Sequence, residues 1–296
     1  MEMRSFALLF FIVLSLVTSP SHAELSASVR KLHLDTDADG IPDEQDACPM
    51  VVGPADAHPK KNGCSPKALA KQWVVSFITK YAPPGRKTYY KHAEETKAEA
   101  LVRYDAIADA LVSVVYDPEV KPLFAGPHGR AQTASVILGV VLWETAFRKD
   151  VDFALGKHGR GDNGESWCLM QIKVGEGKTA DWNIRLNRPA VKTDPPEDIL
   201  SGYTGQQLVA DRKLCIAEGL KIMRGSFGAC KQLPVEERLS AYASGSCDKG
   251  REKSKQRVGT GMKWFQRSLP TRFFRDIDLL PKEEPVQVDL SKFAQG

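Results

Sequence analysis

The chain has 296 residues, a formal net charge of +4, 42 % hydrophobic residues and six cysteines. This length allows one sizeable domain and a small module, and after the first 23 residues no stretch is long and apolar enough to span a membrane. The histidines are scattered without the spacing of zinc ligands, and no nucleotide-binding loop is indicated. We therefore expect no transmembrane segment in the mature chain, no zinc centre and no bound nucleotide.

The first 23 residues have the pattern of a secretory signal peptide. Arg4 supplies the positive start, residues 6–17 form an apolar core, and "SHA" ending at Ala23 resembles a cleavage site. The product is therefore expected to be secreted or periplasmic. The even number of cysteines in such an oxidising compartment predicts disulfides rather than a free catalytic thiol.

Charge is distributed unevenly along the chain. Residues 24–48 hold seven acidic and two basic side chains, a net charge of −5, which leaves +9 for residues 49–296. A basic body suits an anionic polymer such as nucleic acid or an acidic cell-wall glycan, or a membrane surface. General solubilising surface charge is the alternative.

The stretch "DTDADGIPDEQDACP", which begins at Asp35, has the ligand spacing of an EF-hand-type calcium loop. Gly40 allows the sharp turn and the carbonyl of Ile41 adds an oxygen ligand. The carboxylate ligands are expected from Asp35, Asp37, Asp39, Asp43 and Asp46. No flanking helix is evident, and the last ligand is Asp rather than the usual Glu. The motif predicts structural calcium, with a disordered acidic linker as the alternative.

With its trailing "CP" and the later "NGC", this motif resembles the thrombospondin type 3 repeat of many exported bacterial proteins. The resemblance implies a disulfide between Cys48 and Cys64. It also implies a small calcium-binding module and linker over residues 24–66, in which the ion stiffens a spacer before the main domain.

Helical patterns then dominate residues 67–270. Apolar residues recur at helical spacing in segments that predict helices over 67–82, 94–118, 132–147, 202–226 and 234–244. The segment at 132–147 is apolar on nearly every face, as in the central helix of a core. Residues 148–201 are loop-rich, with one short extended segment at 167–174. The predicted fold class is mainly α with a small β element, followed by a tail over 271–296.

"WETAF" places Glu144 at the end of the apolar central segment. Partial burial and the negative end of the helix dipole both raise the pKa of a carboxyl group there. A glutamic acid that stays protonated in this way can act as the general acid in glycosidic cleavage. The alternative is a structural Glu144 paired with Arg148 four residues later.

Three blocks, "WETAF", "GESWCLMQI" and "LSAYASG", resemble the signature blocks of lytic transglycosylases and goose-type lysozymes, in their order. They span residues 143–245, with Thr145, Cys168 and the run 243–245 departing from the usual residues. The resemblance implies a lysozyme-like helical domain that cuts the β-1,4 bond between N-acetylmuramic acid and N-acetylglucosamine. The expected partner is then peptidoglycan, and not nucleic acid.

The resemblance also implies a set of cleft residues. Ser166, Gln171 and Tyr242 would bind the glycan or orient Glu144, and Asp162 or Glu165 would supply a second catalytic carboxylate. Solvated loop charges are the alternative for both acids, and a lytic transglycosylase needs no second carboxylate. Gln171 could instead cap a strand turn, and Tyr242 could be a core residue.

Two more disulfides fit this organisation. Cys230 and Cys247 flank the segment 234–244 and can staple its ends, which leaves Cys168 to pair with Cys215. Trp143 and Trp167 are either sugar-stacking platforms or buried aromatic residues.

Two other functions remain open at this point. One is a non-catalytic, calcium-stabilised wall- or glycan-binding protein, and the other is a calcium-dependent adhesion protein with a helical scaffold. The sequence distinguishes neither hydrolase from transglycosylase nor one oligomeric state from another.

Overall fold

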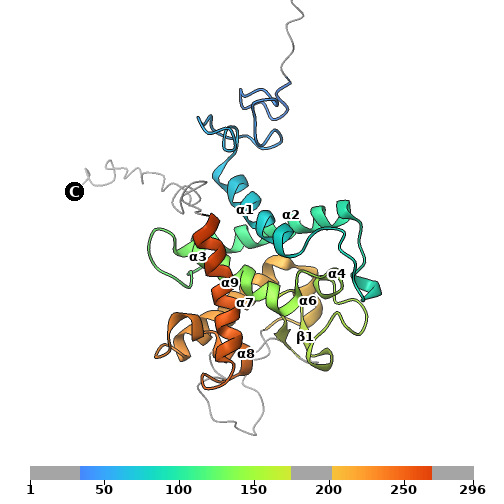
Figure 1. Cartoon of the computed structure of the whole chain (residues 1–296), viewed down its shortest axis with the longest axis vertical. Helices are drawn as coiled ribbons and strands as arrows, with labels where there is room; N and C mark the ends of the chain where they lie inside the picture. Colours follow the sequence, from blue (N-terminus) through green and yellow to red (C-terminus); the bar gives the residue numbers. More distant parts are fainter. Residues whose placement is uncertain (1–33, 175–201, 269–296) are drawn as a thin grey trace, which may run out of the picture.

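The computed structural model describes residues 34–174 and 202–268. The predicted signal peptide, the tail and the end of the loop-rich stretch lie outside these described residues. Within them the chain is mainly helical, with a single short hairpin (Figure 1), so the expected mainly α class with a small β element is confirmed. None of the helices found in the described ranges has the length and apolar character needed to cross a membrane.

The predicted helices of the first half form the core. Helix α1 (Pro66–Tyr81) is capped by the Ser65 side chain, and α2 (Lys97–Val115) begins with a capping box of Thr96 and Glu99. Helix α3 (Gly129–Thr145) is buried along most of its length, as its uniform apolar pattern predicts. Side chains of all three helices belong to one hydrophobic cluster.

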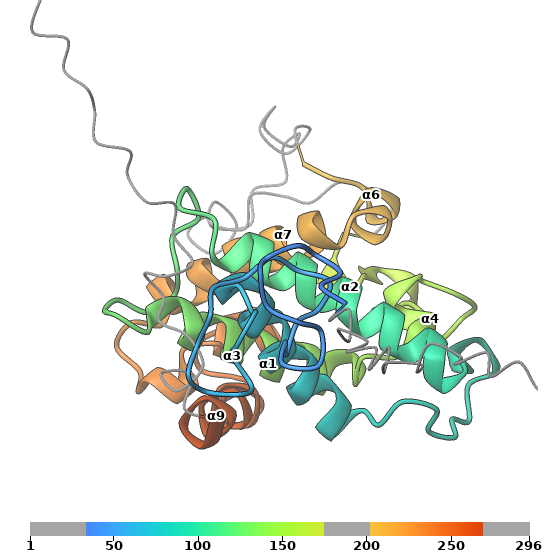
Figure 2. The same ribbon diagram turned by 90° about the horizontal axis from the view of Figure 1, so that it is seen from above.

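Helix α9 (Arg251–Ser268) packs along α3 and was not predicted (Figures 1 and 2). Its buried positions are Ser254, Arg257, Val258 and Gly261, of which only one is a large apolar residue. The two helices come together at glycines: a Cβ added to Gly139 would lie 2.1 Å from the Arg257 carbonyl oxygen, and one at Gly261 would lie 2.1 Å from the Ser135 carbonyl oxygen. Backbone contact makes the closest approach here, and a short apolar stripe of Val258, Met262 and Phe265 packs against the core.

The predicted helix over 202–226 is wrong in one respect, because the chain forms two helices there. Helix α6 (Gly205–Ala210) ends at Asp211, whose side chain accepts hydrogen bonds from the backbone N–H groups of residues 213 and 214. Helix α7 (Arg212–Ala229) therefore starts afresh. The predicted helix over 234–244 is likewise divided, into a 3₁₀ turn η4 (Val235–Glu237) and the short α8 (Ser240–Ser244).

The segment 167–174 is a hairpin rather than one extended strand. Strands β1 (Ser166–Trp167) and β2 (Ile172–Lys173) pair antiparallel, with a turn between them in which Cys168 and Gln171 have positive φ. Neither residue is a glycine, so the sequence carries no ordinary turn signal. The short helices η1 (Lys91–Ala93), α4 (Lys149–Asp152) and η2 (Asp162–Gly164) complete the fold.

All three expected disulfides are confirmed: Cys48–Cys64, Cys168–Cys215 and Cys230–Cys247. The first joins Cys48, just after the acidic loop, to Cys64, just before α1, and both residues are buried in the same cluster as α1. The Gln72 side chain of α1 lies 3.0 Å from the Cys48 sulfur. The module is therefore continuous with the core at this disulfide and is not a free spacer.

The glycine contact between α3 and α9 gives a stability prediction. Replacing Gly139 by Ala forces a methyl group against the α9 backbone and should lower the free energy of unfolding by about 1–3 kcal/mol. At Gly259, which has no atom within 4 Å of an added Cβ, the same change should instead raise it by roughly 0.5–1 kcal/mol through helix propensity. Urea unfolding of both variants is the measurement. Equal effects at the two positions would contradict the close crossing.

Candidate active site

The end of α3 carries Glu144, whose side chain is four-fifths buried, with 20 % exposed. Just after it, Ala146 and Phe147 both have positive φ, so the chain turns sharply away. Arg86 donates to the carbonyl oxygen of Ala146 at 2.8 Å, and Arg103 donates to that of Phe147 at 2.9 Å. The strained turn that follows Glu144 is thus fixed by two guanidinium groups.

Glu144 is paired with a residue more than a hundred positions away. Its Oε1 accepts a hydrogen bond of 2.6 Å from Nη2 of Arg257 on α9, whose side chain is only 9 % exposed. The alternative pairing with Arg148 is wrong, because Arg148 bonds the buried Asp150 at 3.0 Å. Arg257 reaches Glu144 because the glycine crossing brings α9 onto α3.

The balance of these surroundings raises the pKa of Glu144 above its ordinary value. Burial is the largest cause and raises it, Arg257 and the more distant Lys253 lower it, and the charge of Asp162 raises it again. The pKa of Glu144 is therefore shifted in the direction that the sequence predicts. The burial that was expected to raise this pKa is present, and the opposing cation comes from an unpredicted helix.

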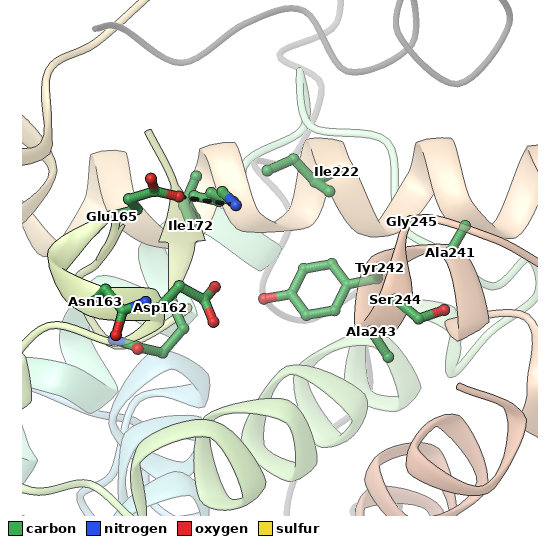
Figure 3. Close-up of a pocket in the computed structure, with 12 residues that line it drawn as sticks. Asp162, Asn163, Glu165, Ile172, Ile222, Ala241, Tyr242, Ala243, Ser244 and Gly245 are labelled. Carbon is green, nitrogen blue, oxygen red and sulfur yellow. Dashed lines mark ion pairs between the residues drawn. The ribbon is translucent and has the colours of Figure 1, made fainter. Parts of the chain in front are cut away.

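A cleft of about 670 Å³ opens beside this region, between the hairpin and α8 (Figure 3). From the hairpin side it is lined by Asp162, Glu165 and Gln171, and from α8 by Tyr242. In Figure 3 the Tyr242 ring points from α8 toward Asp162. Glu144 is not among the described residues that line the cleft, but it is electrostatically coupled to two that do, Asp162 and Tyr242.

Asp162 and Ser166 are hydrogen-bonded to each other in the hairpin wall of the cleft. The Ser166 hydroxyl donates to Oδ2 of Asp162 at 2.6 Å, and Ser166 itself is only 1 % exposed. Asp162 and Asn163 both have positive φ, an uncommon conformation for residues with side chains. Ser166 therefore holds a cleft carboxylate in place and does not itself line the cleft.

The other expected carboxylate, Glu165, lines the cleft but is half exposed. It forms an ion pair of 2.8 Å with Lys173 across the hairpin. This pairing with an exposed lysine raises the pKa of Lys173 and ties the two strands together. Of the two candidates for a second catalytic carboxylate, Asp162 is the one whose charge is among the causes that raise the pKa of Glu144.

Tyr242 and Gln171 line the cleft, as expected of glycan contacts. The Tyr242 hydroxyl donates to the carbonyl oxygen of Met170 at 2.5 Å, and burial together with the nearby Glu144 charge raises its pKa. Gln171 donates to the carbonyl oxygen of Cys168 at 3.1 Å. Both side chains thus brace the hairpin turn while facing the cleft.

Two glycines and a disulfide fix the hairpin against the helices behind it. A Cβ at Gly205 would lie 2.1 Å from the Trp167 indole, and one at Gly219 would lie 2.6 Å from the Met170 side chain. Trp167 is accordingly buried, with Arg160 stacked 4.6 Å from its ring. Trp143, by contrast, is half exposed, and its indole N–H donates a hydrogen bond of 3.0 Å to the Thr260 hydroxyl of α9.

The predicted calcium loop folds around three of its acids. Carboxylate oxygens of Asp35, Asp37 and Asp39 all lie within 4.8 Å of one another, and Gly40 has the positive φ that the sharp turn needs. Desolvation, with the charges of Asp39 and Asp46, raises the pKa of Asp37. The loop therefore concentrates negative charge at one point.

Three buried oxygens in this loop have no hydrogen-bond donor within the described ranges: one each on Asp35, Asp37 and Asp46. Asp43 is differently placed, because both of its oxygens accept bonds from Thr36. Ile41 is buried, and its N–H bonds Asp39 at 2.8 Å. Unpartnered, buried carboxylate oxygens from alternate residues are a donor set suited to a hard cation.

Comparison with protein-family models, with curated proteins and with solved structures found no match to this chain.

The coupling between the two acids can be measured without any activity. Because the negative charge of Asp162 raises the pKa of Glu144, Asp162→Asn should lower it, and the amide still accepts the Ser166 bond. Carboxyl ¹³C NMR titration, with Glu144→Gln to assign the signal, measures the change. Asp248→Asn, at an exposed position, serves as the control. A pKa that rises or stays constant in Asp162→Asn would show that the two acids are not coupled.

Proposed function

We propose that this chain is an exported peptidoglycan-cleaving glycosidase, a lysozyme or lytic transglycosylase, with Glu144 as its general acid. The observation that carries the proposal is a largely buried carboxyl group with a raised pKa, coupled to two residues that line an open cleft. Two of the three sequence blocks supply residues that line this cleft, Gln171 and Tyr242, and the charge of Glu144 from the first block acts on Tyr242. The resemblance of those blocks supplies the substrate class.

In this proposal the protonated Glu144 gives its proton to the glycosidic oxygen. The bond between that oxygen and the anomeric carbon breaks, and its electron pair stays on the leaving oxygen. The Glu144 carboxylate then accepts a proton from the attacking hydroxyl, which is water in a lysozyme and the substrate's own hydroxyl in a transglycosylase. Asp162 is placed to stabilise the positive charge that develops on the sugar ring.

We further propose that the loop at residues 35–46 binds structural calcium. Asp35, Asp37, Asp39 and Asp46 would supply carboxylate ligands and Ile41 a carbonyl, while Asp43 supports the loop through Thr36. The ion would neutralise a cluster of like charges in which one buried oxygen each of Asp35, Asp37 and Asp46 has no donor among the described residues. It would stabilise the module beside the Cys48–Cys64 disulfide, and thus the start of α1.

A non-catalytic glycan-binding protein is the second candidate function. It is favoured by the direct pairing of Glu144 with Arg257 and by the absence of Glu144 from the residues that line the cleft in the described structure. In such a protein the cleft would hold glycan chains without cutting them.

Glu144→Gln separates the two candidates. The amide keeps the size of the side chain but has no acidic proton to give, so clearing of purified sacculi should fall at least about 100-fold while sacculus binding persists. Turbidity and pelleting assays measure the two effects, with Glu252→Gln on the exposed face of α9 as the matched control. Unchanged clearing in Glu144→Gln would remove Glu144 from the mechanism, and binding without clearing in the native protein would favour the second candidate.

In an active protein, anhydro-muropeptide products identify a transglycosylase and reducing ends identify a hydrolase.

Chelation tests the calcium proposal. Because a ligand bound only to the folded state stabilises it, added EGTA should lower the melting temperature by about 5 °C or more relative to excess calcium. Asp37→Asn should melt lower in calcium and respond less to the chelator, whereas Asp248→Asn should behave like the native chain. A melting temperature that is independent of calcium would exclude a stabilising ion in this loop.

A further inference from the structure

We propose that Arg257 is the positioning residue that receives the Glu144 carboxylate once its proton has been given up, and that it thereby sets the upper pH limit of the reaction. This inference rests on the proposed function, because it assigns a role within that reaction cycle. It concerns a residue on α9, a helix that belongs to none of the three sequence blocks.

The contact between the two side chains is incomplete. Only Nη2 of Arg257 donates to Glu144, and only Oε1 of Glu144 accepts. In the part of the chain that the structure describes, Oε2 has no hydrogen-bond partner, so it is available to carry a proton. On the arginine, Nε and Nη1 are buried and also lack acceptors.

A guanidinium group offers its N–H donors as a planar fork that matches the two oxygens of an ionised carboxylate. When Glu144 loses its proton, both oxygens become acceptors, and a small rotation would turn the single bond into a two-point contact. One of the unpartnered N–H groups would then gain an acceptor. Arg257 therefore stabilises the deprotonated form more than the protonated one.

Charged and titratable groups from three elements surround Glu144: Arg257 and Lys253 from α9, Asp162 from η2 and Tyr242 from α8. Lys253 is exposed, so water and salt screen its charge, whereas Arg257 is buried and in direct contact. Its backbone is fixed as well, since the Arg257 carbonyl is the atom against which Gly139 packs. Arg257 is thus the cation that most strongly favours the deprotonated form of Glu144.

Substitution of Arg257 should move the alkaline limb of the pH profile. In Arg257→Met the cation is lost, Glu144 holds its proton to higher pH, and the limb of sacculus clearing should shift upward by about one pH unit or more. Arg257→Lys keeps a positive charge without the fork, so its limb should shift upward by less than that of Arg257→Met. A limb that stays fixed or moves downward in Arg257→Met would overturn the proposal.

The matched control is Lys263→Met, which removes an exposed cation from the same helix and should leave the limb in place. Carboxyl ¹³C NMR titration of Glu144 in each variant supplies a readout that needs no turnover, and should show the same upward shift in Arg257→Met. If the native protein proves inactive, the proposed function fails while this titration still tests Arg257. If Arg257→Met does not fold, the Arg257→Lys titration decides, because a Glu144 pKa at or below the native value would contradict the fork as the source of stabilisation.

Discussion

The close crossing of α3 and α9 is the constraint on which the candidate site depends. Because Gly139 and Gly261 have no side chains, the two backbones touch, and Arg257 is brought to the end of α3 at Glu144. A crossing made by larger residues would hold the helices farther apart and separate the guanidinium from the carboxylate. The electrostatic state of the acid is therefore a consequence of helix packing, decided at positions that carry no chemistry themselves.

Backbone strain is concentrated around the same region. Among the described residues, the non-glycine positions with positive φ between 146 and 171 include those just after Glu144, those at Asp162 and those that bound the hairpin turn. Such conformations persist only where surrounding contacts enforce them. Here the enforcing contacts are the guanidinium groups of Arg86 and Arg103, the Ser166–Asp162 bond and the Tyr242–Met170 bond. Two walls of the cleft are thus held rigidly toward each other.

The sequence predicted what local pattern controls. Apolar spacing located α1, α2 and α3, and the polar end of the apolar run pointed to Glu144. Cysteine positions indicated two of the disulfides, and the resemblance of the acidic motif implied Cys48–Cys64. The prediction failed where the determining contact is distant or uses small residues. Helix α9 buries the small residues Ser254 and Gly261 beside a short apolar stripe, and its Arg257 finds a partner more than a hundred residues away. The hairpin was not predicted because Cys168 and Gln171 adopt positive φ, a turn conformation that is uncommon for these residue types.

The disulfide between Cys168 and Cys215 links the turn of the cleft hairpin to α7, so one wall of the cleft is covalently anchored to the helical body. That anchor forms only where thiols are oxidised. A chain newly made among cellular reductants would carry the same residues without the tether, and its wall would be held by packing alone. The covalent anchoring of this cleft wall therefore depends on the redox state of the chain's surroundings.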